Sequence, residues 1–255
     1  MRNIGIIARK EVKTYFTSPI AYVVIFVFLV LVGFFFYSII SWFNSKSIEI
    51  AQNPYYYQQI NINQMVYAPL FNNMSIILLF MLPLLTMRLF AEEKKAGTEE
   101  LLFTSPVHVL QVILGKYAAA LVVLAAMLGL TGLLSVFTFL WGNPELVQIL
   151  SGYLGLFLMG ASFIAAGVFF SSLTKNQIVA AISTLGTLLL FWILNWATYF
   201  IPGIWKDVLN YLSASQHFET MASGILDTTD VVYYLSFSFF ALFLTHSVIQ
   251  SRRWR

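Results

Sequence analysis

Residues 20–43 read IAYVVIFVFLVLVGFFFYSIISWF and contain no Asp, Glu, Lys or Arg. A helix needs about 20 predominantly apolar residues to cross the hydrocarbon core of a bilayer, so this stretch is long enough to span it. It is too long for the apolar part of a signal peptide, and no small-x-small cleavage site follows it. It is therefore predicted to be an uncleaved membrane helix.

Five further stretches of the same character follow along the chain. Their approximate limits are 69–89, 109–140, 146–173, 178–200 and 231–250, and Pro83 is expected to bend the first of these five. Charged residues make up only 10% of the 255 residues, against about 25% in a soluble domain, and the mean hydropathy is +0.80. The sequence predicts an all-α polytopic membrane protein, a single transmembrane domain over residues 1–255 with six transmembrane helices.

Basic residues set the expected orientation, because cytoplasmic segments carry an excess of Lys and Arg. With the N-terminus inside, all but two of the 14 Lys and Arg residues lie in or beside cytoplasmic segments, the exceptions being Lys46 and Lys206. Both termini are therefore predicted to be cytoplasmic.

The apolar stretches hold almost no ionisable side chains, Arg88 near one cytoplasmic end being the exception. Ion-driven carriers usually place such groups at membrane depth, and a membrane-embedded hydrolase needs a carboxylate pair or a metal cluster. A self-contained carrier or channel is therefore disfavoured, although backbone carbonyls can still bind sodium. The chain has no cysteine for thiolate metal sites and no long basic run for nucleic acid.

The N-terminal segment, residues 1–18, is predicted to be an amphipathic helix. At about 100° per residue its cations gather opposite an apolar arc, a pattern suited to the headgroup layer of a lipid membrane. Glu11 falls near the apolar arc, where we expect it to meet a buried cation or a partner protein. A solvated anchor helix without a partner is the alternative. Ser18 and Pro19 suit the N-cap and first position of the membrane helix that follows.

The cytoplasmic loop over residues 91–105 is the most informative stretch outside the membrane. Gly97 is expected to end the preceding helix, and Thr98 to cap a short new one with Glu99 and Glu100 in its first turn. Leu101, Leu102 and Phe103 then offer an apolar patch to the bilayer surface or to a soluble partner. An ordinary solvated connector is the alternative interpretation.

The loop over residues 201–230, on the opposite side, mixes polar and apolar positions. We expect short helices that lie at the outer leaflet or dip into it. His217 stands alone in this loop and is expected to be structural rather than a ligand. The preceding outer loop contains Tyr67 and a cluster at 55–57, which suit an interfacial aromatic belt.

Several of these motifs together resemble the ABC type-2 permease family, the six-helix membrane subunits of type-2 ABC transporters. The stretches that carry the resemblance are Arg9-Lys10-Glu11 before Ser18-Pro19, Glu92-Glu93-Lys94-Lys95-Ala96-Gly97-Thr98-Glu99-Glu100-Leu101-Leu102 through Ser105-Pro106, and Gly115-Lys116. Near the end, His217-Phe218-Glu219, Gly224-Ile225-Leu226-Asp227 and Ser251-Arg252-Arg253-Trp254 are similar to the subgroup that includes gliding-motility-associated permeases.

The resemblance implies a pump subunit in the bacterial cytoplasmic (inner) membrane. Two such permeases, identical or paralogous, would pair, and each would dock one cytoplasmic ATPase that binds ATP and Mg²⁺. Residues 92–104 would form the coupling helix and residues 2–16 the connecting helix, and the two would form the groove that receives the ATPase. Residues 201–230 would form an outer re-entrant gate. The resemblance assigns to the coupling helix the residues Glu92, Glu93, Lys94, Lys95, Gly97, Thr98, Glu99, Glu100, Leu101, Leu102 and Phe103. It assigns to the connecting helix Arg9, Lys10, Glu11 and Lys13. It assigns to the outer gate His217, Phe218 and Glu219.

The chain lacks the loop that cradles phosphates in an ATPase. That loop reads Gly-x4-Gly-Lys-Ser/Thr, whereas Gly115-Lys116 is followed by Tyr117 and preceded by Leu110 at the first glycine position. We therefore expect no enzyme activity of its own and no cofactor bound directly. An exporter subunit is the favoured interpretation. The alternative is a membrane anchor that transports nothing and couples an ATPase to other envelope machinery through an accessory protein.

Overall fold

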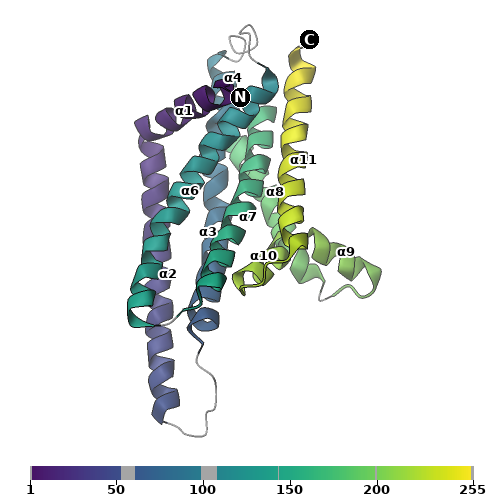
Figure 1. The fold of residues 1–255 in the computed structure, drawn as a ribbon. Coiled ribbons are helices and arrows are strands. Elements are labelled where there is room, and N and C mark those ends of the chain that lie inside the picture. The colour runs from purple at the N-terminus through teal and green to yellow at the C-terminus, as the bar shows by residue number, and fades with distance from the viewer. Residues whose placement is uncertain (1, 53–60, 99–107, 143, 199, 254–255) are drawn as a thin grey trace.

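The apolar stretches form long helices in the computed structural model of the chain, which describes residues 2–52, 61–98, 108–142, 144–198 and 200–253. All described elements are helices (Figure 1). In chain order they are α1 (Arg2–Thr17), α2 (Pro19–Gln52), the π-helical turn η1 (Asn63–Tyr67), α3 (Ala68–Thr86), α4 (Arg88–Ala96), α6 (Val109–Trp141), α7 (Leu146–Leu173), α8 (Gln177–Ala197), α9 (Ile204–Leu212), α10 (Ala214–Ala222) and α11 (Thr228–Arg253). Six helical segments of the described chain are long and apolar enough to cross a membrane.

The predicted limits hold for some helices and not for others. Helix α7 spans the predicted 146–173, and α6 starts at Val109 as expected. Helix α2 runs well beyond residue 43 to Gln52, because no helix breaker follows and Lys46 pairs with Glu49 one turn later at 2.7 Å. The predicted stretch 69–89 lies within one helical run from Asn63 to Ala96, in which α3 and α4 meet at Met87 with helical backbone angles.

Helices α3 and α7 form the centre of the bundle. Each has a membrane-length window of which 72% is buried, against 17% for α2 and for α8. The two central helices touch closely at Gly167, where an added Cβ would lie 2.0 Å from the Thr86 hydroxyl oxygen. Tyr67 is also buried, with its hydroxyl bonded to Thr138. The prediction of an interfacial belt was therefore wrong for Tyr67, and residues 55–57 lie outside the described residues.

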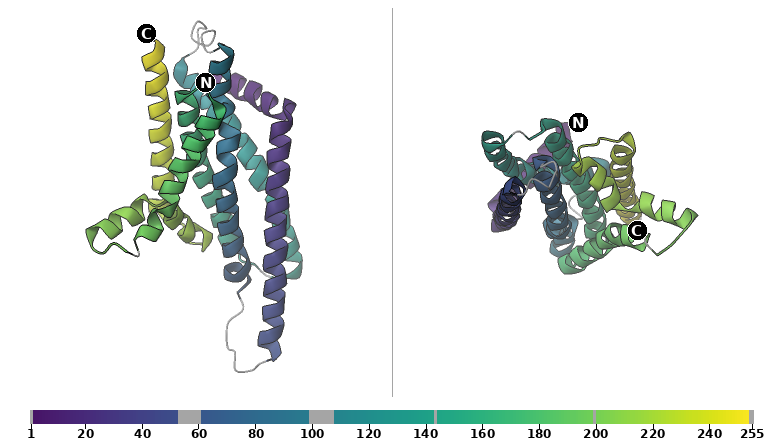
Figure 2. Two further views of the ribbon diagram at one scale, coloured as in Figure 1. Left: turned by 180° about the vertical axis from the view of Figure 1, so that it is seen from behind. Right: turned by 90° about the horizontal axis from the view of Figure 1, so that it is seen from below.

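Both chain ends lie at the same end of the bundle, which we call the terminal end (Figure 1). Helix α1 lies across this end and packs on α6, and α4 lies beside it. At the other end of α11, which we call the far end, α10 packs against α7 while α9 projects sideways (Figure 2). The short helices expected over 201–230 are therefore present.

Candidate functional site

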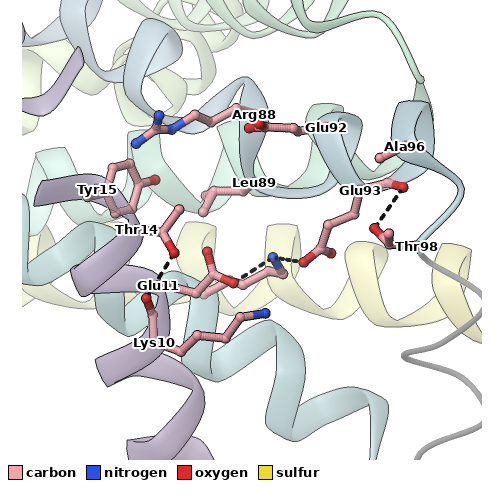
Figure 3. Close-up of a pocket in the computed structure, with 11 residues that line it drawn as sticks. Lys10, Glu11, Thr14, Tyr15, Arg88, Leu89, Glu92, Glu93, Ala96 and Thr98 are labelled. Atoms are coloured by element: carbon pink, nitrogen blue, oxygen red, sulfur yellow. Dashed lines mark hydrogen bonds and ion pairs between the residues drawn. The ribbon is translucent and has the colours of Figure 1, made fainter. Parts of the chain in front are cut away.

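A pocket of about 360 Å³ lies at the terminal end, between α1 and α4 (Figure 3). We call it the α1–α4 pocket. Helix α1 is placed there by its contact with α6, and α4 by its position at the end of α3. Its lining residues are Lys10, Glu11, Thr14, Tyr15, Arg88, Leu89, Glu92, Glu93, Ala96, Thr98 and Lys116.

Lys116 of α6 joins the two walls of the pocket. Its ammonium nitrogen lies 3.1 Å from the Glu11 carboxylate and 2.8 Å from the Glu93 carboxylate, and only 2% of its side chain is exposed. It also lies 5.2 Å from the ring centre of Phe90. A buried ammonium is stable only when opposite charges and hydrogen bonds compensate its lost hydration. The three charges therefore bind α1, α4 and α6 to one another.

Helix α1 can reach α6 because the residue before Lys116 has no side chain. A Cβ added to Gly115 would lie 2.6 Å from Ile7 Cγ2 and 2.8 Å from Ile7 Cβ. Such contacts are shorter than van der Waals packing permits. Gly115 thus allows the helix approach that brings Glu11 to Lys116.

Tyr15 and Arg88 close the side of the pocket nearest the membrane helices. The Tyr15 hydroxyl donates to the Leu85 carbonyl at 3.1 Å, and the Arg88 guanidinium lies 4.5 Å from the centre of the Tyr15 ring. Burial raises the pKa of Tyr15 well above its ordinary value, so the phenol remains a donor. Arg88 donates to the Ser18 hydroxyl at 3.2 Å, which ties α4 to the junction of α1 and α2.

Helix α4 is also fixed to the end of α7. The Ser171 hydroxyl accepts from the backbone N–H groups of Phe90 and Ala91 at 3.0 and 3.1 Å, and it donates to the Met87 carbonyl at 2.9 Å. Backbone donors in the first turn of a helix need such external partners. Lys94 is 4% exposed and donates to the Ser172 carbonyl, so its side chain is directed to α7 rather than into the pocket.

Gly97 ends α4, as the sequence predicts. Its φ of 71° is in the left-handed region that favours glycine at this position. The Thr98 hydroxyl donates back to the Glu93 carbonyl at 3.3 Å. The short helix predicted after Thr98, with Glu99, Glu100, Leu101, Leu102 and Phe103, and the pair Ser105-Pro106 lie outside the described residues.

The structure brings together some of the residues predicted for the connecting helix and for the coupling helix. Lys10 and Glu11 of α1 and Glu92 and Glu93 of α4 line one pocket, as the labelled side chains in Figure 3 show. Arg9, Lys13 and Lys95 are exposed and lie outside its lining. The expectation that Glu11 meets a buried cation is confirmed, and that cation is Lys116.

Two buried polar atoms around the pocket lack a hydrogen-bond partner. They are Oε2 of Glu93, an acceptor, and an Nη2 of Arg88, a donor. Buried polar groups are nearly always hydrogen-bonded, so each unpaired one calls for an explanation. Both atoms have essentially no accessible surface, so a group that enters the pocket reaches them only after these two side chains move.

The predicted gate residues lie at the far end, on α10. His217 and Phe218 are buried, and Glu219 is exposed. The His217 Nδ1 lies 2.6 Å from the Asp230 carboxylate of α11. Loss of hydration raises the pKa of the Glu219 carboxyl. In the described part of the chain, no group of three His, Cys, Asp or Glu residues is arranged to hold a metal ion.

Comparison with known proteins identifies the fold at family level. The family described as ABC-2 family transporter protein matches residues 43–249, which is most of the chain. A search of curated proteins gave no match.

Proposed function

Since the chain belongs to the ABC-2 family of transporter proteins and is a permease subunit of an ABC transporter, we propose that it docks a cytoplasmic ATPase at the α1–α4 pocket. The observation that carries this proposal is the Lys116 ion pair with Glu11 and Glu93. It makes α1 and α4 one unit around an open pocket, and α4 follows directly on the central helix α3. A force applied at the pocket therefore acts on the centre of the bundle.

The charged lining of the pocket supports the same proposal. It holds cations and carboxylates from α1 and α4, so it suits a polar or charged side chain of an ATPase. Charges of both signs favour specificity in docking more than affinity. The exposed Lys10 and Glu92 stand in its lining, where a docked protein would meet them.

We propose the remaining parts of the assembly by similarity to the family. ATP and Mg²⁺ bind to the ATPase, and its closure rocks a pair of permeases, identical or paralogous, between inward-open and outward-open states to export a substrate. The terminal end faces the cytoplasm of a bacterial cell, in the inner membrane, as the distribution of Lys and Arg predicts. The His217-Phe218-Glu219 segment is similar to that of the gliding-motility-associated permeases, which we propose as the subgroup of this chain.

Charge reversal at the pocket lining tests the docking site. The chain would be co-expressed with the ATPase encoded beside it, and ATPase co-purification and hydrolysis rate would be measured for Lys10→Glu/Glu92→Arg. Both residues are exposed, so the variant should fold and lose at least about tenfold in ATPase affinity, which corresponds to about 1.4 kcal/mol. Lys175→Glu is the matched control, an exposed cation at the same end but outside the pocket lining.

Three results would contradict the proposal at different levels. Equal ATPase binding by wild type and the double variant would show that docking occurs elsewhere. No ATPase binding by the wild type would reject the pump assembly itself. If the ATPase binds but proteoliposomes show ATP hydrolysis without movement of any substrate, an anchor role replaces export.

A further inference from the structure

A buried cluster of polar side chains at the far end joins α10 to its neighbours on both sides. His217 of α10 and Asp230 of α11 are 6% and 4% exposed. The His217 Nδ1 lies 2.6 Å from one Asp230 carboxylate oxygen, and its Nε2 lies 2.9 Å from the Tyr211 carbonyl oxygen of α9. The second Asp230 oxygen accepts from the Thr220 hydroxyl. The His217 ring therefore stands between α9 and α11 and contacts both.

The two contacts of the His217 ring need more hydrogen than a neutral imidazole carries. A neutral ring has one N–H group, and its other nitrogen can only accept. The Tyr211 carbonyl and an ionised Asp230 carboxylate are also acceptors only. Both contacts are therefore hydrogen bonds only if the cluster has bound one extra proton, either on His217 Nδ1 or on the Asp230 carboxyl.

Three features favour the ring as the place of the extra proton. An imidazole is ordinarily a stronger base than a carboxylate. The ring of Tyr233 stacks on the His217 ring with centroids 4.1 Å apart, and a cation is attracted to an aromatic face. The Thr220 hydroxyl bond stabilises negative charge on Asp230. The cluster is therefore an imidazolium–carboxylate pair in which hydrogen bonds compensate the lost hydration of both charges.

The helices that pack against α10 leave Asp230 as the main charged partner of the ring. Helices α3, α7 and α8 pack on α10 and contain no Asp, Glu, Lys, Arg or His. On α9, Lys206 and Asp207 lie in the first turn, away from the contact with the ring near the last turn. Glu219 of α10 is exposed and lies two residues along the helix from the ring. The titratable residues that face the ring are Tyr211, Asp227, Asp230, Tyr233 and Tyr234.

Loss of the extra proton leaves His217 with one N–H group for two acceptors. The bond to Asp230 is the stronger of the two, because its acceptor is ionised, so the remaining hydrogen stays on Nδ1. The bare Nε2 then faces the Tyr211 carbonyl oxygen at 2.9 Å, where two acceptors repel each other. The Tyr233 hydroxyl still donates to the Leu212 carbonyl at 2.8 Å. The C-terminal end of α9 thus loses one of these two bonds.

We propose that His217 and Asp230 form a proton-binding site that fastens α9 to α10 and α11, and that loss of the proton loosens α9. The ligand is a proton taken from the side of the membrane that the far end faces. The segment over residues 201–230 therefore responds to the pH on that side. This role does not depend on ATPase docking at the α1–α4 pocket, which lies at the opposite end of the bundle.

Nitrogen-15 NMR of the histidine rings tests the protonation state, because the chain has only three histidines. In His108→Gln/His246→Gln, His217 is the single histidine and the cluster is untouched. In phosphatidylcholine–phosphatidylglycerol vesicles at pH 7, both of its ring nitrogens should carry hydrogen, whereas an isolated histidine is mostly neutral there. One bare ring nitrogen in this variant at pH 7 would overturn the proposal.

Asp230→Asn is the matched control for the same measurement. The asparagine amide can donate to Nδ1, so a neutral ring satisfies both contacts in this variant. Added to the single-histidine chain, it should leave one bare ring nitrogen at pH 7. Two protonated nitrogens in this variant would show that Asp230 does not hold the proton, and would also overturn the proposal.

A nitroxide label on Val208→Cys of α9 tests the loosening, since the chain has no cysteine of its own. When the pH is raised from 6 to 9, the label should become several-fold more mobile in the chain with Asp230. It should keep its mobility in Asp230→Asn, where a neutral His217 still reaches Tyr211. No change in either chain would show that the proton does not hold α9. An equal increase in both would assign the effect to another titrating group and reject this site.

Discussion

Lys116 is buried where three helices meet, and its two carboxylate partners come from segments distant in sequence. Replacement by Met leaves Glu11 and Glu93 without their cation in a poorly hydrated site. Breaking such a pair from one side typically costs about 3 kcal/mol or more. Lys116→Met should therefore lower the free energy of unfolding by about 3 kcal/mol, measured by denaturant titration in detergent.

Lys116→Arg is the matched control, because it keeps the positive charge and both carboxylate partners. It should lose less than half as much stability as Lys116→Met. Equal losses would show that side-chain shape, rather than charge, holds α1 and α4 together.

The stability of the folded chain should depend on pH through Glu219, and the direction of this dependence can be derived. Loss of hydration raises the pKa of its carboxyl in the folded chain, so between the ordinary and the raised pKa the folded state binds more protons than the unfolded state. The stabilising contribution is complete below the ordinary pKa and is lost as the pH rises through the raised one. Glu219→Gln should remove this dependence and raise the melting temperature relative to wild type at pH 7 but not at pH 4.

Asp227 serves as a control, because its contribution to stability should change with pH in the opposite direction. Its carboxylate accepts from the Thr229 backbone N–H at 3.0 Å, and this bond lowers its pKa. Its contribution is present above its ordinary pKa and is lost as the pH falls through the lowered one. Asp227→Ala should therefore lower the melting temperature at pH 7. If both variants shift the melting temperature in the same direction at pH 7, the assigned environments are wrong.

At the scale of elements, the packing of α1 on α6 depends on Gly115. Gly115→Ala places a methyl group 2.6 Å from Ile7 Cγ2, so one helix must move or the side chain must rotate. Overpacking of this kind costs about 1–3 kcal/mol. We expect a loss of that size in the free energy of unfolding, together with weaker ATPase binding because Glu11 is displaced from Lys116.

Gly129→Ala is the control on the same helix. Nothing lies within 4 Å of a Cβ at Gly129, and alanine favours a helix over glycine by about 1 kcal/mol. This variant should keep or increase stability. A similar loss for both variants would mean that helix flexibility, not contact with α1, explains the effect.

The sequence predicted the ends of helices correctly where a single residue determines the end. Gly97 ends α4, and the Ser18 hydroxyl accepts from the Ile20 N–H at 3.4 Å after α1 ends at Thr17. The helical course of the backbone through Met87 agrees with the single stretch predicted over residues 69–89. The serine bonds that fix α4 come from Ser171 on another helix, and no local pattern reveals such a partner.

The candidate site was predicted in part for the same reason. The sequence placed Glu11 near an apolar arc and predicted that it meets either a buried cation or a partner protein. That the cation is Lys116 depends on how α1 crosses α6. Tyr15 and Arg88 gave no signal beyond their types, because a cation–π contact across 73 positions of sequence arises only from tertiary packing. Residues 99–103 remain a prediction.

At the scale of the whole molecule, orientation can be tested with the cysteine-free chain. Thr98 lies at the terminal end and Asp207 at the far end, and both are exposed. A membrane-impermeant maleimide should label Asp207→Cys in intact spheroplasts. Thr98→Cys should react only after the membrane is opened. The reverse pattern would invert the orientation that the basic residues predict.

The junction between α3 and α4 has a mechanical consequence. Pro83 has no N–H to bond the preceding turn, but the backbone stays helical through Met87, with φ −53° and ψ −31°. Helix α4 is fastened to α1 through the Lys116 pairs with Glu11 and Glu93, and to α7 through Ser171. A push on α4 is therefore shared by three helix ends as one rigid block. Tyr15 of α1 also bonds to the Leu85 carbonyl and Ser171 of α7 to the Met87 carbonyl, so the block includes the α3–α4 junction. A push from the ATPase would therefore reach the central helices α3 and α7 together.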